Sequence, residues 1–209
     1  SSSLTPPAIC SGSTFYYLPT STTPGASFSW TRASVPGISN PSSLGTGDPI
    51  ETLTNTTASP VNVTYNYAVS ANGCSNSQNV VVTVNPTPTL SSTLAPPAIC
   101  SGTAFSYTPG STTAGASYSW TRLAVVGINN AAGTGPGDPN ETLVNITPNP
   151  VAVTYVYTVS ANSCSNPTAY SVIVVVNPTP VLTSTSNPPS ICSGTAFNYT
   201  PTSTTHGTF

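Results

Sequence analysis

An internal repeat of about 90 residues limits what this chain can fold into. The motif Pro-Pro-Ala/Ser-Ile-Cys-Ser-Gly occurs three times, with its cysteine at Cys10, Cys100 and Cys192, so successive copies are 90 and 92 residues apart. Trp-Thr-Arg, Gly-Asp-Pro and Val-Asn-Pro-Thr-Pro each occur twice, also 90 or 92 residues apart. A unit of this length is too long for a solenoid repeat and matches an autonomous Ig-sized domain of about 100 residues.

The repeat predicts two full domains, at residues 1–85 and 91–177, and the start of a third at residues 183–209. The Pro-rich segments between them, 86–90 and 178–182, are expected to be linkers. Their Asn-Pro-Thr-Pro sequence favours extended polyproline geometry and predicts a short, semi-rigid spacer. Because the third copy stops partway through its predicted core, we expect these 209 residues to be part of a longer array.

The hydrophobic pattern predicts strands throughout each copy. In segment 61–70, valine and tyrosine at odd positions alternate with polar or small residues, and segment 151–159 repeats this alternation. Strict period-two alternation is typical of a half-buried strand. Further strands are expected at 14–18, 27–32, 50–55 and 79–85. With no helical period in any window, the sequence predicts an all-β fold of tandem, Ig-like, antiparallel β-sandwich domains.

The scarcity of charge excludes several kinds of partner. Lys and Arg together number 2, Asp and Glu number 4, and charged residues make up 3% of the chain, against about a quarter in ordinary soluble proteins. Nucleic-acid binding needs a basic surface, as does a polybasic membrane contact. No apolar run reaches the roughly 18 residues of a membrane span. We therefore expect no nucleic-acid partner and no membrane insertion of this segment.

Each full copy carries two cysteines, which we predict to form disulfides within a repeat, Cys10 with Cys74 and Cys100 with Cys164. Metal binding is the alternative, but no CxxC pair or histidine cluster accompanies these cysteines. Closing a loop of about 65 residues stabilises a domain by roughly 4 kcal/mol on the chain-entropy model. Disulfides imply an oxidising, extracellular or cell-surface location. Cys192 has no such partner in the sequence.

The few charged residues recur at matched positions, which suggests a structural ion pair. We predict that the single arginine of each copy pairs with one of its two acids and braces the sandwich, because an unpaired buried charge is costly. A solvated turn and a metal site are the alternatives. The residues concerned are Arg32, Asp48 and Glu51 in the first copy and Arg122, Asp138 and Glu141 in the second.

The inventory of reactive side chains predicts neither catalysis nor a cofactor. The only histidine, His206, has no counterpart in the other copies and is expected to lie in an exposed loop. A Ser-His-Asp triad needs an aspartate, yet each full copy has just one, in its Gly-Asp-Pro turn. We therefore predict no catalytic, cofactor-binding or metal-binding residue.

The aromatic residues have two interpretations. Trp30, Trp120 and the ten tyrosines suit either a sugar-stacking platform or a hydrophobic core. Core packing is favoured because Tyr65 and Tyr67 share the apolar face of segment 61–70 with three valines. We expect the tryptophans to be buried.

Covalent glycans are expected because an almost uncharged surface lacks the usual protection against association. Such a surface is either meant to associate or solubilised by sugars. Ser/Thr-linked sugars fit as well as Asn-linked ones. Asn-x-Ser/Thr sequons mark five candidate residues: Asn55, Asn62, Asn140, Asn145 and Asn198. Asn62 lies on the polar face of its predicted strand.

The ordered set of recurring motifs resembles the PKD-like (Ig-like) repeats of Bacteroidota surface proteins. The motifs are Ile-Cys-Ser-Gly, Trp-Thr-Arg, Gly-Ile-Ser/Asn-Asn, Glu-Thr-Leu-x-Asn, Val-Thr-Tyr-x-Tyr, Ala-Asn-Gly/Ser-Cys-Ser-Asn and Val-Asn-Pro-Thr-Pro. The resemblance implies a β-sandwich of about seven strands, tandem arrays and export, often through the type IX system. Such repeats act as stalks, adhesins or spacers.

The function predicted from the sequence is structural. We expect a repeat segment of an extracellular fibre or cell-surface stalk, with copies of itself and covalent glycans as partners. The alternative from a different class is an adhesin whose repeats bind a surface glycan or another ligand, which requires an exposed aromatic cluster in each copy. A passive spacer beside an enzyme elsewhere in the polypeptide is the third hypothesis.

Overall fold

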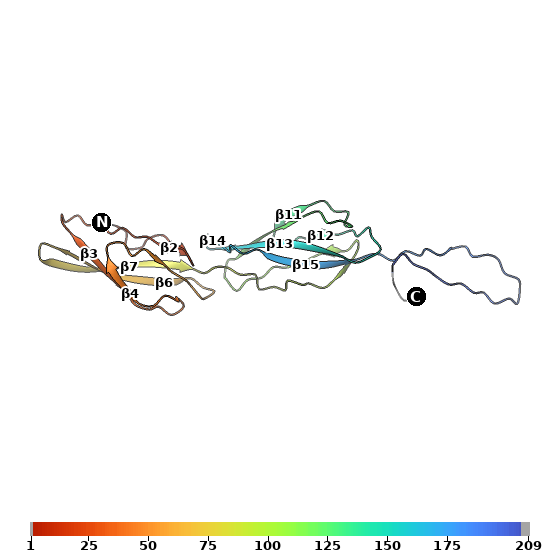
Figure 1. Ribbon diagram of the computed structural model, residues 1–209, viewed down its shortest axis with the longest axis horizontal. Helices are drawn as coiled ribbons and strands as arrows, with labels where there is room; N and C mark the ends of the chain where they lie inside the picture. Colours follow the sequence, from red (N-terminus) through yellow and green to blue (C-terminus); the bar gives the residue numbers. More distant parts are fainter. Residues whose placement is uncertain (1, 206–209) are drawn as a thin grey trace. The chain divides into compact units, whose positions relative to one another are not determined.

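The computed structural model describes residues 2–205, which contain β-strands and no helix (Figure 1). The strands of the first repeat are β1 (Ile9–Cys10), β2 (Thr14–Phe15), β3 (Ser27–Arg32), β4 (Ser43–Thr46), β5 (Glu51–Thr52), β6 (Val61–Ala71) and β7 (Cys74–Asn85). Those of the second are β8 (Ile99–Cys100), β9 (Ala104–Phe105), β10 (Ser117–Arg122), β11 (Gly133–Pro136), β12 (Glu141–Thr142), β13 (Val151–Ala161), β14 (Cys164–Ser165) and β15 (Tyr170–Asn177).

Each repeat has a large sheet and a small one. In the first repeat the large sheet has the order β1-β7-β6-β3-β4, and the small sheet pairs β2 with β5. The second repeat reproduces both, with the order β11-β10-β13-β15-β8 and the pair β12-β9. This arrangement confirms the predicted tandem Ig-like β-sandwich. One detail differs from the prediction, since β1 pairs with β7, and β8 with β15, in parallel.

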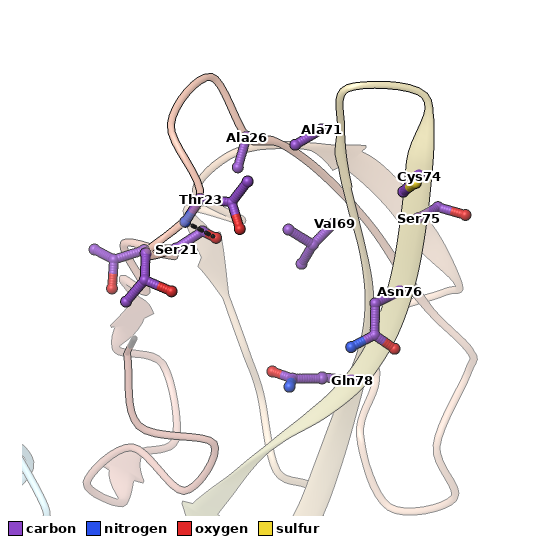
Figure 2. Close-up of a pocket in the computed structure, with 11 residues that line it drawn as sticks. Ser21, Thr23, Ala26, Val69, Ala71, Cys74, Ser75, Asn76 and Gln78 are labelled. Atoms are coloured by element: carbon purple, nitrogen blue, oxygen red, sulfur yellow. Dashed lines mark hydrogen bonds between the residues drawn. The ribbon is translucent and has the colours of Figure 1, made fainter.

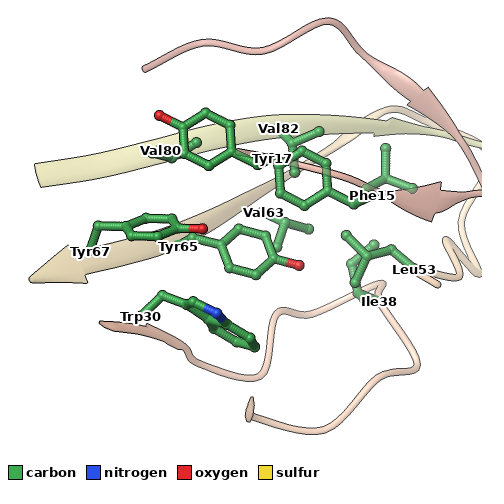
Figure 3. Packing of buried hydrophobic residues seen from close by; sticks show 11 residues of the cluster. Phe15, Tyr17, Trp30, Ile38, Leu53, Val63, Tyr65, Tyr67, Val80 and Val82 are labelled. Carbon is green, nitrogen blue, oxygen red and sulfur yellow. The ribbon is translucent and has the colours of Figure 1, made fainter. Parts of the chain in front are cut away.

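The core of the first repeat follows from the period-two pattern of the long strands. On β6, Val63, Tyr65 and Tyr67 are buried, and β7 adds three buried valines at alternate positions. Figure 3 shows Val63, Tyr65 and Tyr67 of β6, with Val80 and Val82 of β7, packed together with Phe15 and Leu53 of the opposite layer. A strand places alternate side chains on opposite faces, so the polar residues of β6 face outward.

Trp30 closes the core on the side of β3 and is 6% exposed, as predicted. Its ring lies 5.4 Å from that of Tyr65 in an edge-on arrangement. Gly45 of β4 lies against this indole, and a Cβ at Gly45 would be 2.8 Å from the ring. The sequence did not predict β4 because glycine is depleted in strands. At Gly45 the tryptophan leaves no room for a larger side chain.

The second repeat differs from the first in its last strand. The single strand β7 corresponds to two strands, β14 and β15, separated by residues 166–169. Pro167 lies in this interruption and cannot donate a backbone hydrogen bond to a neighbouring strand. The two extra residues of the second copy also fall in this part of the chain.

The third copy has no named strand within residues 178–205 and one isolated bridge, between Leu182 and Ser203. It nevertheless repeats local contacts of the full copies. The Ser184 and Tyr199 hydroxyls lie 2.6 Å apart, as do those of Ser92 and Tyr107. In the first repeat, β1 pairs with β7 and β2 pairs with β5. Residues 178–205 contain no counterpart of β5 or β7, so the third copy forms neither pairing within this range.

Contacts divide the chain into two compact units that do not coincide with the repeats. The first unit joins residues up to Ser91 with Gly110–Ser117 and Thr158–Thr168. The second unit consists of Ser92–Pro109, Tyr118–Tyr157 and the chain from Ala169 onward. A loop of the second repeat, and a segment that contains the end of β13 and the strand β14, therefore pack with the first repeat.

Truncating Leu53 tests how much the layer that contains the small sheet contributes to the stability of the first repeat. Leu53 is 0% exposed, whereas Leu44 is 78% exposed. We expect Leu53→Ala to lower the free energy of unfolding by about 2–5 kcal/mol, because lost burial and a residual cavity add together. Leu44→Ala is the matched control and should change it by less than about 0.5 kcal/mol. Urea denaturation followed by tyrosine and tryptophan fluorescence measures both, and equal effects would contradict the assigned packing.

Candidate functional site

A buried ion pair joins the two layers of the first repeat. Arg32 of β3 is 2% exposed and donates from Nε and Nη2 to the two carboxylate oxygens of Glu51, both at 2.9 Å. Nη2 also donates to the Pro41 carbonyl at 2.7 Å, and the Tyr65 hydroxyl donates to Glu51 Oε2 at 2.6 Å. A bidentate guanidinium–carboxylate pair fixes orientation as well as distance. The pair therefore sets how β5 lies over β3.

The second repeat reproduces this pair almost atom for atom. Arg122 donates to both Glu141 oxygens at 2.8 Å, and Tyr155 donates to the same carboxylate at 2.7 Å. The Ala131 carbonyl accepts from Arg122 Nη2 at 2.6 Å. The predicted pairing of each arginine with one acid is confirmed, and the acid is the glutamate in both copies.

The environment of the pair keeps both groups charged. Burial acts to raise the pKa of Glu51, but hydrogen bonds from Arg32 and Tyr65 outweigh it and leave the pKa below its ordinary value of 4.5. The hydrogen bond from Arg122 is the main cause of the lowered pKa of Glu141, and burial opposes it. Burial and the bond to Glu51 raise the pKa of Tyr65, so its hydroxyl remains a donor.

The two aspartates serve a different purpose from the glutamates. Asp48 accepts the backbone N–H of Tyr17 at 2.8 Å, and Asp138 accepts that of Tyr107 at 2.8 Å. Burial acts to raise the pKa of Asp138, but hydrogen bonds from Ser106 and from backbone N–H groups lower it overall. The Gly-Asp-Pro turn is thus hydrogen-bonded to the residue that lies just after β2 in the first repeat and just after β9 in the second. Its aspartate does not pair with the arginine.

The predicted cysteine pairing is wrong. Cys10 is bonded to Cys164, across 154 residues of sequence, whereas Cys74 and Cys100 have exposed free thiols. In the first repeat, Cys10 is level with Asn85 at the end of β7, while Cys74 begins that strand. Eleven residues at about 3.3 Å each separate the two positions by roughly 36 Å, and a disulfide requires Cα atoms within about 7 Å.

The same geometry prevents a bond between Cys100 and Cys164. Cys100 is level with Asn177, next to the start of β13, while Cys164 pairs with Ala161 at the end of β13. Each repeat therefore has its first cysteine at one end of the sandwich and its second at the other. The bond that forms connects successive repeats.

Two hydrogen bonds accompany this disulfide within the first unit. The Asn85 side-chain amide donates to the Asn162 carbonyl at 3.1 Å. The Asn166 side-chain amide donates to the Pro88 carbonyl at 2.9 Å. We call these two bonds, with the Cys10–Cys164 disulfide, the junction. Sequence reasoning missed the asparagines, although Asn85 and Asn162 recur as Asn177 and Asn72.

The first predicted linker is part of the packed first unit. Within 86–90, Pro86, Pro88 and Leu90 are buried, although an isolated spacer exposes such residues. In the second linker, Pro180 and Leu182 are exposed. Packing therefore restrains the first linker in addition to its two prolines.

Two of the five predicted glycosylation sites are buried. Asn55 is 6% exposed, and its side-chain amide donates both hydrogens, to the carbonyls of Ser59 and Val84 at 2.8 Å. Asn145 is 7% exposed and makes the equivalent two bonds. An Asn-linked glycan replaces one of these hydrogens and needs space, so the prediction is wrong for both residues in the folded chain.

Asn55 and Asn145 instead connect a loop to the last residues of a long strand in each repeat. Such a buried amide is stabilising only when its hydrogen bonds are made. Asn62, Asn140 and Asn198 are exposed and stay predicted glycan sites.

Among residues 2–205, no group of three or more His, Cys, Asp or Glu side chains is placed to bind a metal ion. In the same part of the chain, no helix is long and apolar enough to cross a membrane. His206 lies outside the described residues, so its predicted exposure stays a prediction.

The paired sheets, the layer-bridging ion pair and the cystine between copies together define a tandem Ig-like β-sandwich protein. The family model described as "PKD-like domain" matches twice, at residues 7–88 and 97–180. The chain belongs to the PKD-like domain family. These matches span most of both predicted domains, whose boundaries at 85 and 91 stay predictions.

Solved structures with related folds are distant. A search of curated protein sequences gives no match. Mouse cadherin-23 EC22-24 is 14% identical with a TM-score of 0.38, over 85% of this chain and 63% of that one. The endo-fucoidan hydrolase MfFcnA4 of glycoside hydrolase family 107 is 14% identical with a TM-score of 0.30, over 86% of this chain and 28% of the hydrolase. The zebrafish RET cadherin-like domains 1 to 4 are 12% identical, with a TM-score of 0.26, over 74% of this chain and 41% of that one. The chain thus spans less than two thirds of each of these proteins.

Removing the acid of the ion pair tests its structural role. We expect Glu51→Gln to lower the free energy of unfolding by about 3–5 kcal/mol, because it leaves the buried Arg32 guanidinium without a counter-charge. Asp48→Asn is the matched control, since its side-chain oxygen still accepts the Tyr17 N–H, and it should cost less than about 1 kcal/mol. Chemical denaturation measures both changes. An unchanged free energy of unfolding in Glu51→Gln would contradict the role assigned to the pair.

The lowered pKa values of Glu51 and Glu141 predict a loss of stability in acid. Ionised glutamate favours the folded state, so this contribution is complete at pH values above the ordinary pKa of 4.5. It disappears as the pH falls through the lower pKa of the folded state. The unfolding free energy should be nearly constant from about pH 6 to 8 and decrease below about pH 4.5. Urea titrations across this range should show a much weaker acid dependence in the Glu51→Gln/Glu141→Gln variant.

Proposed function

We propose that this chain is a tension-bearing structural segment of an extracellular fibre or cell-surface stalk. The observation that supports this most directly is the Cys10–Cys164 disulfide, which joins one repeat to the next instead of closing each repeat on itself. A bond between neighbours adds little to the internal architecture of one sandwich. It does link the first sandwich covalently to the segment of the second repeat that carries Cys164.

The disulfide changes the covalent path that a pulling force follows. Force applied at the chain ends passes from Cys10 through the sulfur–sulfur bond to Cys164 and bypasses the residues between them. These residues include strands β2 to β13. Strands β2 to β13 are therefore shielded from direct extension, whereas β15 lies beyond Cys164 and still carries the force. Shielding of most strands suits a segment that must keep its length under load.

The same bond stabilises the folded pair of repeats. Cross-linking across 154 residues reduces the entropy of the unfolded chain by an amount equivalent to about 5 kcal/mol on the chain-entropy model. PKD-like domains are usually extracellular, and disulfides persist in oxidising compartments. Both facts support the proposed extracellular setting.

The distribution of charge suits close association of copies. Four of the six charged residues belong to the two arginine–glutamate pairs. The remaining two, Asp48 and Asp138, are engaged in turns. Long-range repulsion between copies is consequently weak. Covalent glycans on exposed Asn62, Asn140 or Asn198, or on serine and threonine, are part of this proposal as the solubilising groups.

The adhesin hypothesis required a recurring, exposed aromatic cluster. Trp30 and Trp120 are 6% and 5% exposed, and both lie in cores. Tyr16 is 67% exposed, but Ser106 occupies the equivalent position in the second repeat. No aromatic platform recurs among the described residues, so we retain the structural role.

Stretching single molecules tests the proposed function. We expect the oxidised chain, pulled from its ends, to lengthen only by the residues outside Cys10–Cys164. Reduction should release a further 500–550 Å, roughly, since 154 residues extend by about 3.3–3.6 Å each. Cys10→Ser should give the long extension without reductant, and the control Cys100→Ser should keep the short one. The long extension in oxidised wild-type chain would contradict the proposal.

A further inference from the structure

The outer face of the large sheet in the second repeat carries a group of exposed apolar side chains. Strands β13 and β15 contribute four of them, and the loop after β10 contributes two. All six belong to the second compact unit. Thr154 pairs with Ile173 in the middle of the group. We call the group the apolar face, and it consists of Leu123, Val126, Ala152, Val156, Ile173 and Val175.

The first repeat has polar side chains at the central positions of the same face. Thr83 donates to the Asn62 side chain across the ladder at 2.8 Å, and their equivalents in the second repeat are Val175 and Ala152. Asn66, which is also hydrogen-bonded across this ladder, corresponds to Val156. The exchange removes the sequon at Asn62, so an Asn-linked glycan at that position cannot cover the apolar face. The apolar character is therefore a property of the second repeat and not of the fold.

An open groove runs along the apolar face. It has a volume of about 440 Å³ and lies between the loop after β10 and strand β13. The described residues that line it include threonines and aliphatic side chains, and none is charged or aromatic. Without an aromatic ring it has no stacking platform for a sugar, and without a basic group it does not attract anionic lipid.

The groove of the first repeat in Figure 2 differs in both chemistry and place. Ser21, Thr23, Asn76 and Gln78 line it, with Val69 at its floor. It lies at an end of the sandwich, and the equivalent end of the second repeat is packed with the first repeat at the junction. That groove is consequently an end surface of the repeat, whereas the apolar face is a lateral one.

Neighbouring repeats leave the lateral face of a sandwich open. The first repeat is packed at the junction with segments of the second, yet Pro36, Asn62 and Asn66 on this side are exposed. In the second repeat Cys164 is bonded at the same junction, and Val156 is exposed. Because the face stays open on both sides of a formed junction, its exposure does not depend on which repeats precede or follow.

The outer face of this sheet is smaller than a standard protein interface. Strand β13 has 11 residues. At about 3.4 Å per residue, and with β10, β13 and β15 roughly 4.8 Å apart, the face measures about 500 Å². A standard interface buries roughly 800 Å² per partner. One such contact is therefore weak, and it becomes strong when the same two chains repeat it along their length.

We propose that the apolar face binds the apolar face of a second copy of this chain, so that two chains pair side by side. This inference deepens the proposed fibre function and rests on it, because a fibre supplies the repeated contact that a small face needs. The pairing is two-fold symmetric, with the same patch on both partners. No charge has to be desolvated on either side, since all four acids and both arginines of the chain are held elsewhere.

The shape of the face suits this partner as well. Valine, isoleucine and threonine project from a pleated sheet and interdigitate with a second sheet about 10 Å away. Thr154 lies near the two-fold axis, with Val156 on one side of it along β13 and Ala152 on the other. Leu123, which is 80% exposed, then finds cover against the partner sheet.

Sedimentation velocity of the whole 209-residue chain tests the pairing. The Cys10–Cys164 bond is kept, and the exposed thiols of Cys74, Cys100 and Cys192 are alkylated with iodoacetamide so that disulfide exchange cannot link copies. We expect a reversible monomer–dimer equilibrium between about 10 μM and 1 mM, as suits a small interface. Sodium sulfate should strengthen it, because sulfate favours burial of apolar surface. A chain that remains monomeric up to about 1 mM would overturn the proposal.

Two leucines of equal exposure show whether the apolar face makes the contact. Leu123→Ala should weaken the dimer at least about tenfold, because each partner loses apolar area in the contact. Leu44→Ala is the matched control, since Leu44 is 78% exposed but lies on β4 of the first repeat. It should leave dimerisation unchanged. Equal effects of the two substitutions would place the contact elsewhere and refute the proposal.

A second variant gives the second repeat the surface of the first. The triple variant Ala152→Asn/Val156→Asn/Val175→Thr introduces residues that the first repeat carries at the same positions. It should be monomeric across the same range and should unfold at nearly the same urea concentration as the parent chain. Undiminished dimerisation of this folded variant would contradict pairing through the apolar face.

Failure of the pairing and failure of the proposed function give different results. If the chain stays monomeric while single oxidised molecules still show the short extension, lateral pairing alone is wrong. If oxidised molecules show the long extension, the tension-bearing function is wrong whatever the sedimentation result.

Discussion

The length of the paired β6–β7 hairpin controls how this protein is cross-linked. Its ladder runs from Val61↔Val84 at one end to Ala71↔Cys74 at the other, and β1 pairs only at the first of these ends. The two cysteines of a repeat are therefore held at opposite ends of the sandwich. Because a cystine tolerates only a short Cα separation, the two cysteines of one repeat cannot bond to each other. The bond that forms, between Cys10 and Cys164, joins different repeats. The connection between repeats follows from strand length and not from any special linker.

The buried arginine–glutamate pair complements this arrangement by fixing the small sheet on the large one. The small sheet has two strands of two residues each. Strands this short make too few hydrogen bonds to hold the sheet in place on their own. Glu51 anchors it through Arg32 and Tyr65, and Phe15 and Leu53 then enter the core. Paired charges are costly to bury but specify one geometry. In a chain with so few charges, using four of them in this way leaves the surface almost neutral.

Much of the candidate site was predictable, although its connectivity was not. The recurrence of Arg32 and Glu51 as Arg122 and Glu141 indicated the ion pair, and alternation indicated that Trp30 and Tyr65 are in the core. The cysteine pairing failed because counting two cysteines per repeat carries no information on which end of the sandwich each occupies. The sequons at Asn55 and Asn145 failed for a related reason, since a three-residue motif does not report burial. The recurrence of Asn85 and Asn162 in the second and first copies was a usable signal for the junction.

The sequence by itself determined the repeat length, the strand periodicity, the all-β class and the pairing of each arginine with an acid of its own repeat. These properties depend on local patterns and on spacing along the chain, which are readable without coordinates. Only the tertiary structure decided which cysteines bond, which asparagines are buried, and that the first linker is packed with loops of the next repeat. Each of these depends on distances between residues that are far apart in sequence, and the strand register sets those distances.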